Sequence, residues 1–128
     1  MKLPDQARKL LDGRNFASVA TLMRDGSPQV TPVWVDREGD VVVINATMKR
    51  QKYKNLKRDP RVALDVFDQS NPYSKVVIRG KVVEMTKEGA EAHIDKLSMK
   101  YNNNPKYPNH SLGEPRVIIR IEPLSVTK

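Results

Sequence analysis

Short segments with the composition of β-strands, separated by turn signals, fill the first half of this sequence. Residues 16–22 are rich in small and β-branched side chains, and Asp25-Gly26 is a hairpin turn signal before the extended residues 28–35. The two prolines within residues 28–35 indicate an edge strand or a bulge. The continuous apolar run at residues 41–45 is typical of a strand that is buried on both faces. Together these segments predict a β-meander.

The second half of the sequence adds further strands and one long helix. Thr86 is expected to cap this helix, because Glu88 would lie in its first turn and an apolar stripe follows at helical spacing. The stripe consists of Ala90, Ile94, Leu97 and Tyr101. Strands are predicted at residues 61–67, 75–83 and 117–121, and loops at residues 68–72 and 102–115.

Two shorter helices are predicted near the start of the chain and after the apolar run. The first begins after Pro4 and ends at Gly13, with an apolar face formed by Leu3, Ala7, Leu10 and Leu11. The second would cover residues 50–58, if the basic connector at residues 47–59 is helical there. Six short strands with two or three helices predict an α+β, mainly β, fold: a small closed or half-closed barrel with peripheral helices. Because a small barrel fills its interior with side chains, a cofactor would bind outside it or at a subunit interface.

Length and composition narrow the possible functions. The 128 residues suit a single domain covering residues 1–128. The absence of cysteine excludes a disulfide framework, a thiolate nucleophile, an iron–sulfur cluster and a cysteine zinc site. No segment reaches the roughly 20 apolar residues of a membrane span, and the first residues contain no apolar signal core. We therefore expect a cytoplasmic protein without a membrane span.

The charge balance predicts an anionic partner. The chain has 23 Lys and Arg against 15 Asp and Glu, a formal net charge of +8. Nucleic acid, an acidic membrane surface and a phosphorylated small molecule are all compatible with this charge. Seven of these cations lie within residues 49–61, directly after the apolar run.

A phosphate site is the functional interpretation of this basic segment. If residues 50–58 are helical, Arg50, Lys54 and Lys57 share one face, while Tyr53 and Leu56 point to the core. A strand that ends in a polar turn and enters a helix presents backbone N–H groups, a hydroxyl and cationic side chains around one point. The alternative interpretation is a solvated charged helix.

The order of several motifs resembles a known family. These motifs lie at residues 26–35, 45–47, 50–52, 55–56, 58–61, 73–80, 100–101, 106–108 and 116–123. Together they are similar to the split β-barrel flavin/deazaflavin oxidoreductases of the pyridoxamine 5'-phosphate oxidase-like superfamily, and among these to the group that uses coenzyme F420. The resemblance covers nearly the whole chain and implies a six-stranded FMN-binding split barrel.

The resemblance also implies a homodimer with two cofactor sites at its interface. The implied ring contacts are Thr31, Pro32 and Val33, with Trp34 close by on the same strand. The ring edge and ribityl chain would contact Asn45, Ala46 and Thr47, and the phosphate would be held by Arg50, Gln51 and Lys52. Tyr73 and Ser74 would reach across from the other subunit. Because the coenzyme itself carries out hydride transfer, no catalytic side chain and no metal are expected.

Two departures from the family pattern argue against pyridoxamine-phosphate oxidation. Gln51 stands where flavin-using oxidases of the superfamily commonly have an arginine. The sequence also ends at Lys128, without the longer C-terminal segment that those oxidases use to bind pyridoxal phosphate.

Charge favours the deazaflavin over FMN as the cofactor. Coenzyme F420 carries a phosphodiester and a glutamate tail, and Lys49, Lys54 and Lys57 could form a cationic track for it. FMN ends at its phosphate and needs no such track. Because exposed ion pairs contribute only about 0–1 kcal/mol each, FMN remains the alternative cofactor, in an oxidoreductase or in a flavin-binding protein without turnover. The expected substrate is a small conjugated or unsaturated molecule, which the sequence does not identify further.

Other candidate residues and functions receive less support. His93 and His110 have no carboxylate or second histidine at ligand spacing, so structural or exposed roles are expected for both. Trp34 and Tyr53 are interpreted from the pattern alone as core residues. A basic β-barrel that binds nucleic acid is a distant alternative, because aromatic residues are only 5% of the chain and the basic segment contains only Tyr53. We expect a small-molecule substrate and no nucleic-acid partner.

Overall fold

Seven strands and three helices form the computed structural model of the chain, which describes residues 1–110 and 114–128. The elements in chain order are α1 (Asp5–Asp12), β1 (Ala17–Leu22), β2 (Pro28–Val33), β3 (Asp36–Glu38), β4 (Val41–Thr47), α2 (Gln51–Arg58), β5 (Arg61–Asp68), β6 (Asn71–Thr86), α3 (Ala90–Asn102) and β7 (Arg116–Thr127). The fold is therefore mainly β with peripheral helices, as the sequence predicts.

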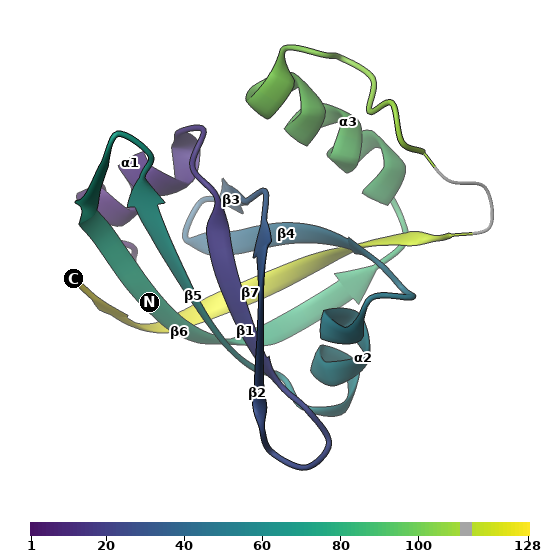
Figure 1. Ribbon diagram of the computed structural model, residues 1–128, viewed down its shortest axis with the longest axis horizontal. Helices are drawn as coiled ribbons and strands as arrows, with labels where there is room; N and C mark the ends of the chain where they lie inside the picture. Colours follow the sequence, from purple (N-terminus) through teal and green to yellow (C-terminus); the bar gives the residue numbers. More distant parts are fainter. Residues whose placement is uncertain (111–113) are drawn as a thin grey trace.

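All seven strands belong to one antiparallel sheet in the order β2-β1-β5-β6-β7-β4-β3. The long strand β6 pairs with β5 at residues 71–81 and with β7 at residues 77–86, so that it links the two halves of the sheet. Figure 1 shows α1 at one end of the sheet and α2 and α3 toward the other. The sheet is a split barrel that does not close, with β2 and β3 as its edges among the described residues.

The prediction of six strands is wrong by one strand. The additional strand, β3, has only three residues, Asp36, Arg37 and Glu38, which pair with the start of β4. Three polar residues carry neither the alternation nor the apolar run that identifies a strand in a sequence. Their pairing depends on the hairpin turn at Gly39, whose φ is 61°.

The core lies between the faces of the curved sheet and under the helices. Val42, Val43 and Ile44 are completely buried, which confirms the prediction that residues 41–45 are covered on both faces. Tyr53 and Leu56 pack into the same core from α2, also as predicted. The apolar face of α1 contributes the buried residues Ala7, Leu10 and Leu11.

Three predicted boundaries are wrong. Thr86 does not cap α3, because β6 continues through Thr86 and the helix begins at Ala90, after Gly89 in the left-handed conformation. The threonine hydroxyl instead accepts a hydrogen bond from the Glu88 amide within the connecting turn. Strand β6 already begins at Asn71, within the predicted loop 68–72. Strand β7 continues past Pro123, because the register with β6 shifts near Gly80, where the ladder tolerates a residue without an N–H.

The predicted loop 102–115 falls partly outside the described residues, at positions 111–113. Its first residue, Asn102, ends α3. None of the helices in the described part of the chain has the length and apolar character needed to cross a membrane.

Candidate cofactor site

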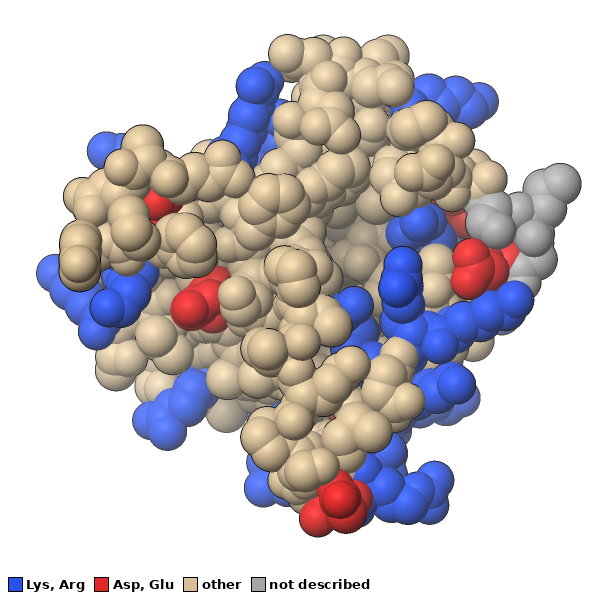
Figure 2. All heavy atoms as spheres, in the orientation of Figure 1, with Lys and Arg blue, Asp and Glu red and all other residues tan. Residues whose placement is uncertain are grey.

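A cavity of about 600 Å³ lies where β2, β4, α2, α3 and the start of β7 meet. It is lined by Gln29, Thr31, Pro32, Val33, Trp34, Asn45, Ala46, Thr47, Lys49, Arg50, Gln51, Lys52, Ile94, Leu97, Tyr107 and Arg116. Figure 2 shows the corresponding hollow, with Lys and Arg side chains gathered around it. The cavity opens to the outside of the split barrel, as expected for a small barrel with a filled interior.

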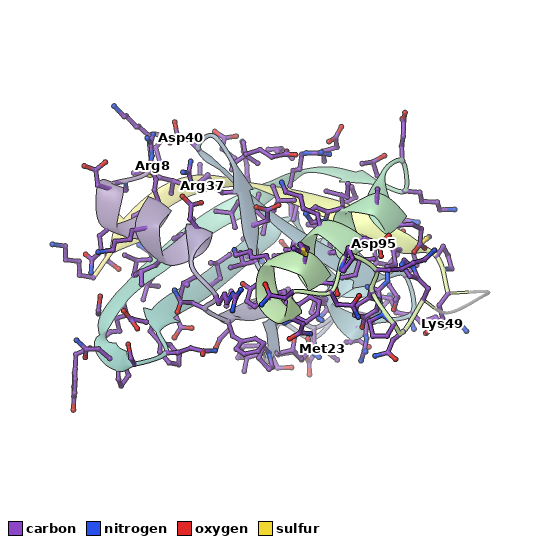
Figure 3. The ribbon with its side chains drawn as sticks, turned by 90° about the horizontal axis from the view of Figure 1, so that it is seen from above. Arg8, Met23, Arg37, Asp40, Lys49 and Asp95 are labelled. Atoms are coloured by element: carbon purple, nitrogen blue, oxygen red, sulfur yellow. The ribbon has the colours of Figure 1, made fainter. Side chains whose placement is uncertain are left out.

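Four cationic side chains line this cavity, and no acidic side chain does. They are Lys49, Arg50, Lys52 and Arg116. None of the four takes part in a salt bridge with any residue in the described ranges 1–110 and 114–128. Figure 3 shows Lys49 at the opposite end of the molecule from the paired charges Arg8 and Asp40. The cavity therefore has a concentrated positive charge that the described part of the protein does not neutralise.

Lys52 is the most deeply buried of these cations, with 8% of its surface exposed. Burial lowers the pKa of its ammonium group, and the charge of the neighbouring Arg50 lowers it further. A buried lysine is stabilised by an opposite charge. The environment of Lys52 therefore suits an anionic ligand.

Helix α2 holds the cationic residues in place through Asn55. This side chain is completely buried, and its amide donates a 2.9 Å hydrogen bond to Thr21 Oγ1 on β1. Its oxygen accepts a 2.8 Å hydrogen bond from Gln51 Nε2. The start of α2, where backbone N–H groups lack helical partners, is thereby fixed beside the end of β4.

Two hydroxyl groups at cavity-lining positions have no partner. Thr31 Oγ1 on β2 and Thr47 Oγ1 on β4 are buried without a hydrogen bond among the described residues. A buried hydroxyl without a partner costs about 1–3 kcal/mol, so native proteins usually satisfy it. Both residues lie on walls of the cavity, although the two oxygens themselves are shielded from solvent.

Aromatic residues line the part of the cavity near Arg116, whose guanidinium lies 4.8 Å from the centre of the Tyr107 ring. The Trp34 ring stacks on Tyr101 at a centroid distance of 5.1 Å, and Tyr107 meets its edge at 5.8 Å. Tyr107 is held in place because its backbone N–H donates a 2.7 Å hydrogen bond to Asp95 Oδ1 on α3. A cavity with a cationic end and an aromatic end suits an elongated molecule with a planar ring and a negatively charged tail.

The structure brings together nine of the eleven residues that the resemblance implies as cofactor contacts. Thr31, Pro32 and Val33, then Asn45, Ala46 and Thr47, and then Arg50, Gln51 and Lys52 all line the one cavity. Trp34 lines it as well, so its interpretation as a core residue is wrong. The other two residues, Tyr73 and Ser74, lie elsewhere. Tyr73 is 90% exposed, and Ser74 lines a separate groove beside α1.

Five cavity residues had no assigned role at this site from the sequence. Gln29 lies on β2, Ile94 and Leu97 come from the predicted apolar stripe of α3, and Tyr107 comes from the loop after it. The fifth, Arg116, pairs directly with Thr47 in the β4–β7 ladder. Because these positions are 69 residues apart in the sequence, only the strand pairing reveals that Arg116 belongs to the site.

Both histidines have carboxylate partners in the structure. His93 is buried, and its Nε2 lies 3.3 Å from Asp36 Oδ2. His110 lies between Glu91 and Asp95 of α3, at 2.6 and 2.7 Å, and the hydrogen bonds with Asp95 and Glu91 raise its pKa. Within residues 1–110 and 114–128, no group of three or more His, Cys, Asp or Glu side chains is arranged to hold a metal ion.

Comparison with known proteins agrees with the fold. A family model for pyridoxamine 5'-phosphate oxidase matches residues 3–128. The structure of an F420 reductase superposes with a TM-score of 0.87 at 34% identity, with 98% of each chain covered. This chain belongs to the pyridoxamine 5'-phosphate oxidase-like superfamily of split-barrel flavin and deazaflavin oxidoreductases.

More distant structures share the fold alone. A conserved hypothetical protein of Mycobacterium tuberculosis has a TM-score of 0.75 at 22% identity, covering 98% of this chain and 83% of that one. General Stress Protein 26 of Bacillus anthracis has a TM-score of 0.65 at 13% identity, with 95% and 89% covered. A search of curated proteins finds no match to the sequence.

Proposed function

We propose that this protein is an oxidoreductase that uses coenzyme F420 to transfer a hydride to or from a small conjugated or unsaturated substrate. The observation that carries the proposal is a cavity on a split barrel similar to that of an F420 reductase, lined by four cations that no acidic residue in the described ranges neutralises. When bound, the deazaflavin supplies the hydride chemistry. The chain's own residues bind it, orient the substrate and exclude water.

The residues at the cationic end suit the phosphate and the tail of this coenzyme. Arg50 and Lys52 would hold the phosphate together with the first backbone N–H groups of α2. Gln51 lies beside them, with its amide bonded to Asn55. Lys49 at the cavity mouth and the exposed Lys54 and Lys57 on α2 would form the track for the glutamate tail.

The residues at the other end suit the ring and the ribityl chain. Thr31, Pro32 and Val33 on β2 would lie along the ring, with Trp34 closing that end. Thr47 would contact the ribityl chain together with its neighbours Asn45 and Ala46, and the orphaned hydroxyls of Thr31 and Thr47 would acquire partners.

A homodimer forms part of the proposal. Tyr73 lies near the start of β6, just after the turn that joins β5 to β6, and the residue is 90% exposed. An exposed aromatic ring beside a hairpin turn is suited to contact another protein chain. We propose that Tyr73 and Ser74 complete the cofactor site of the partner subunit.

FMN is the second candidate cofactor, because the family model that covers residues 3–128 describes a pyridoxamine 5'-phosphate oxidase. The same ring and phosphate contacts would serve a flavin, and only the lysine track distinguishes the two molecules. Nucleic acid fits less well, because the cations converge on a cavity rather than on a row of aromatic platforms.

Separate titrations with the two coenzymes test the proposal. Purified protein is expected to bind F420 with micromolar or better affinity, measured by the coenzyme's fluorescence, and to bind FMN more weakly. A protein that is yellow when purified and releases FMN on denaturation would favour the flavin instead. Binding of neither coenzyme would refute the proposal.

Two lysine variants then test the phosphate site. Lys52→Ala is expected to weaken F420 binding at least tenfold, because it removes the buried cation. Lys9→Ala on α1 removes an exposed lysine outside the cavity and is the matched control. Equal effects of both substitutions would contradict the proposed site.

A further inference from the structure

The side-chain amide of Asn45 is bonded within the protein, although the residue lines the cavity. Its Nδ2 donates a 2.9 Å hydrogen bond to the Ala90 carbonyl and lies 3.2 Å from His93 Nδ1. Its Oδ1 accepts a 3.1 Å hydrogen bond from Arg116 Nη1. An asparagine has only two N–H donors, so both donors of Asn45 are used within the protein.

These contacts determine which atoms of Asn45 and His93 carry protons. The Ala90 carbonyl requires an N–H from Asn45, and the Arg116 guanidinium requires an oxygen, so the amide has only one possible orientation. His93 Nδ1 must then accept the second N–H of Asn45, and the ring proton lies on Nε2. That proton points to Asp36 Oδ2 at 3.3 Å.

Asp36, at the acidic end of this series of hydrogen bonds, is ionised. Burial alone would raise the pKa of Asp36, but hydrogen bonds from His93 and the Arg37 amide outweigh burial and lower it. The ammonium group of Lys96, 3.2 Å from the same carboxylate, lowers it further. The Asp36 carboxylate therefore remains an acceptor for His93.

Arg116 lies at the cavity end of the same chain. Its guanidinium is 4.8 Å from the centre of the Tyr107 ring, and its side chain lines the cavity between the aromatic wall and β4. It has no salt bridge within the described ranges. Asn45 uses one Nη1 proton, and no described residue accepts a hydrogen bond from the remaining guanidinium protons.

We propose that Arg116 is the ligand-binding cation at the aromatic end of the cavity and that Asp36, His93 and Asn45 position it. The group it binds is an ionised oxygen on a planar ring system, because the guanidinium lies beside the cavity's aromatic residues. This inference rests on the proposed function for the source of that ring, which is either the coenzyme itself or the conjugated substrate.

A pair of small probes tests the role of Arg116 without assuming a coenzyme. The probes are 2-naphthoate, a planar ring with a carboxylate, and 2-naphthamide, its neutral analogue. The wild-type protein is expected to bind the naphthoate about tenfold more tightly, and Arg116→Gln to abolish this preference. Arg120→Gln is the matched control on the same strand, because Arg120 pairs with Glu38 and Glu84 outside the cavity.

Two outcomes of this titration would overturn the role of Arg116. One is a wild-type protein with no preference for the naphthoate. The other is a preference that survives Arg116→Gln but disappears in Lys52→Gln, which would place the carboxylate at the phosphate end. A preference lost only in Arg116→Gln supports the proposal.

The positioning of Arg116 by Asp36, His93 and Asn45 has its own test, which compares two replacements of different shape at position 93. In His93→Asn the side-chain oxygen occupies the place of Nδ1 and can still accept from Asn45, whereas His93→Leu removes the acceptor. We expect His93→Asn to keep most of the preference for naphthoate and His93→Leu to reduce it about fivefold. Equal effects of the two variants would refute positioning by His93.

Nitrogen NMR of the wild-type protein adds a readout that does not depend on a variant folding. At neutral pH the His93 ring is expected to carry its proton on Nε2, with Nδ1 unprotonated. A ring protonated on Nδ1, or on both nitrogens, would overturn the hydrogen-bond chain as described.

Coenzyme titrations of Arg116→Gln identify the source of the ionised oxygen. A loss of F420 affinity of tenfold or more assigns it to the coenzyme. Unchanged F420 affinity, with the naphthoate preference retained by the coenzyme-saturated wild type, assigns it to the substrate. A protein that shows the Arg116-dependent preference but binds neither F420 nor FMN would refute the proposed function alone. Coenzyme binding without the preference would refute this inference alone.

Discussion

Replacing Lys52 with methionine should make the free protein more stable and its anion site weaker. Lys52 is 92% buried beside Arg50, without a carboxylate partner among the described residues, and burial holds its pKa below the ordinary value of 10.5. Methionine has a similar length and no charge, so the substitution removes the desolvation cost and retains most of the packing.

The expected gain in the free energy of unfolding follows from the removal of a buried charge. An ionised group without a partner costs at least about 1–3 kcal/mol when fully buried, and the lysine's access to the cavity places the cost near the lower end. We expect Lys52→Met to raise the free energy of unfolding by about 1 kcal/mol and the melting temperature by about 4 °C. Lys54→Met, an exposed lysine on the same helix, should change the stability by less than about 0.5 kcal/mol.

Added phosphate should make the wild type more stable than Lys52→Met, which is the reverse of their order without phosphate. A ligand present at ten times its dissociation constant stabilises the folded state by about 1.4 kcal/mol. The wild type would gain this amount, whereas Lys52→Met, with a weakened site, would gain much less. Thermal melts at one fixed protein concentration, with and without phosphate, measure both effects.

The difference in stability between the wild type and Lys52→Met should depend on pH, because burial lowers the pKa of Lys52. The folded protein loses the Lys52 proton at a lower pH than the unfolded chain, so the charged lysine destabilises the fold fully below the folded-state pKa. As the pH rises from that value toward 10.5, the wild type should approach Lys52→Met in stability. A Lys52→Met protein that is less stable than the wild type without phosphate would refute the reasoning, as would one that gains equally from phosphate.

Three further substitutions test the supports of the site and the sheet. Asn55→Leu removes the buried amide that holds α2 against β1, and a urea titration should show a loss of about 2–4 kcal/mol with weaker phosphate binding. Gly80→Ala places a Cβ 2.3 Å from the Glu122 carbonyl, so its urea midpoint should fall by the equivalent of about 3 kcal/mol. The hydrogen bond with Asp95 raises the pKa of His110, so this contact stabilises the loop below the ordinary histidine pKa. It should weaken as the pH rises through the raised value, visible as faster amide exchange at residues 103–110. His110→Asn should remove that pH step, and a step that persists in this variant would contradict the assignment.

The sequence predicts elements well where burial is continuous or periodic. The apolar run at residues 41–45 and the stripe Ala90, Ile94 and Leu97 both lie in the described core as expected. The sequence predicts the ends of helices and strands poorly where pairing with a distant strand determines them. Strand β6 extends to Thr86 because β7 offers partners there, and no local signal at that threonine distinguishes a strand end from a helix cap.

The meeting of the proposed phosphate contacts at one cavity was predictable, because these residues follow each other along the chain. Thr47, Arg50 and Lys52 lie within one strand–turn–helix segment, and their shared location follows from local geometry. The role of His93 was not predictable in this way. Its partners Asp36 and Asn45 lie on β3 and β4, about 50 residues away, and helical spacing alone gives no reason to place a histidine beside them.

The contrast between residues placed by local chain geometry and residues placed by distant strand pairing explains why the two ends of the cavity can differ in what they bind. At the phosphate end, local chain geometry places the cations, so a change there should alter affinity for any phosphorylated ligand. At the aromatic end, Arg116 faces the cavity because the pairing of β7 with β4 sets it beside Asn45, and α3 contributes the histidine that orients this amide. Under the proposed function, substitutions in α3 that leave Arg50 and Lys52 in place should therefore change which ring system the protein accepts without changing its affinity for the phosphate.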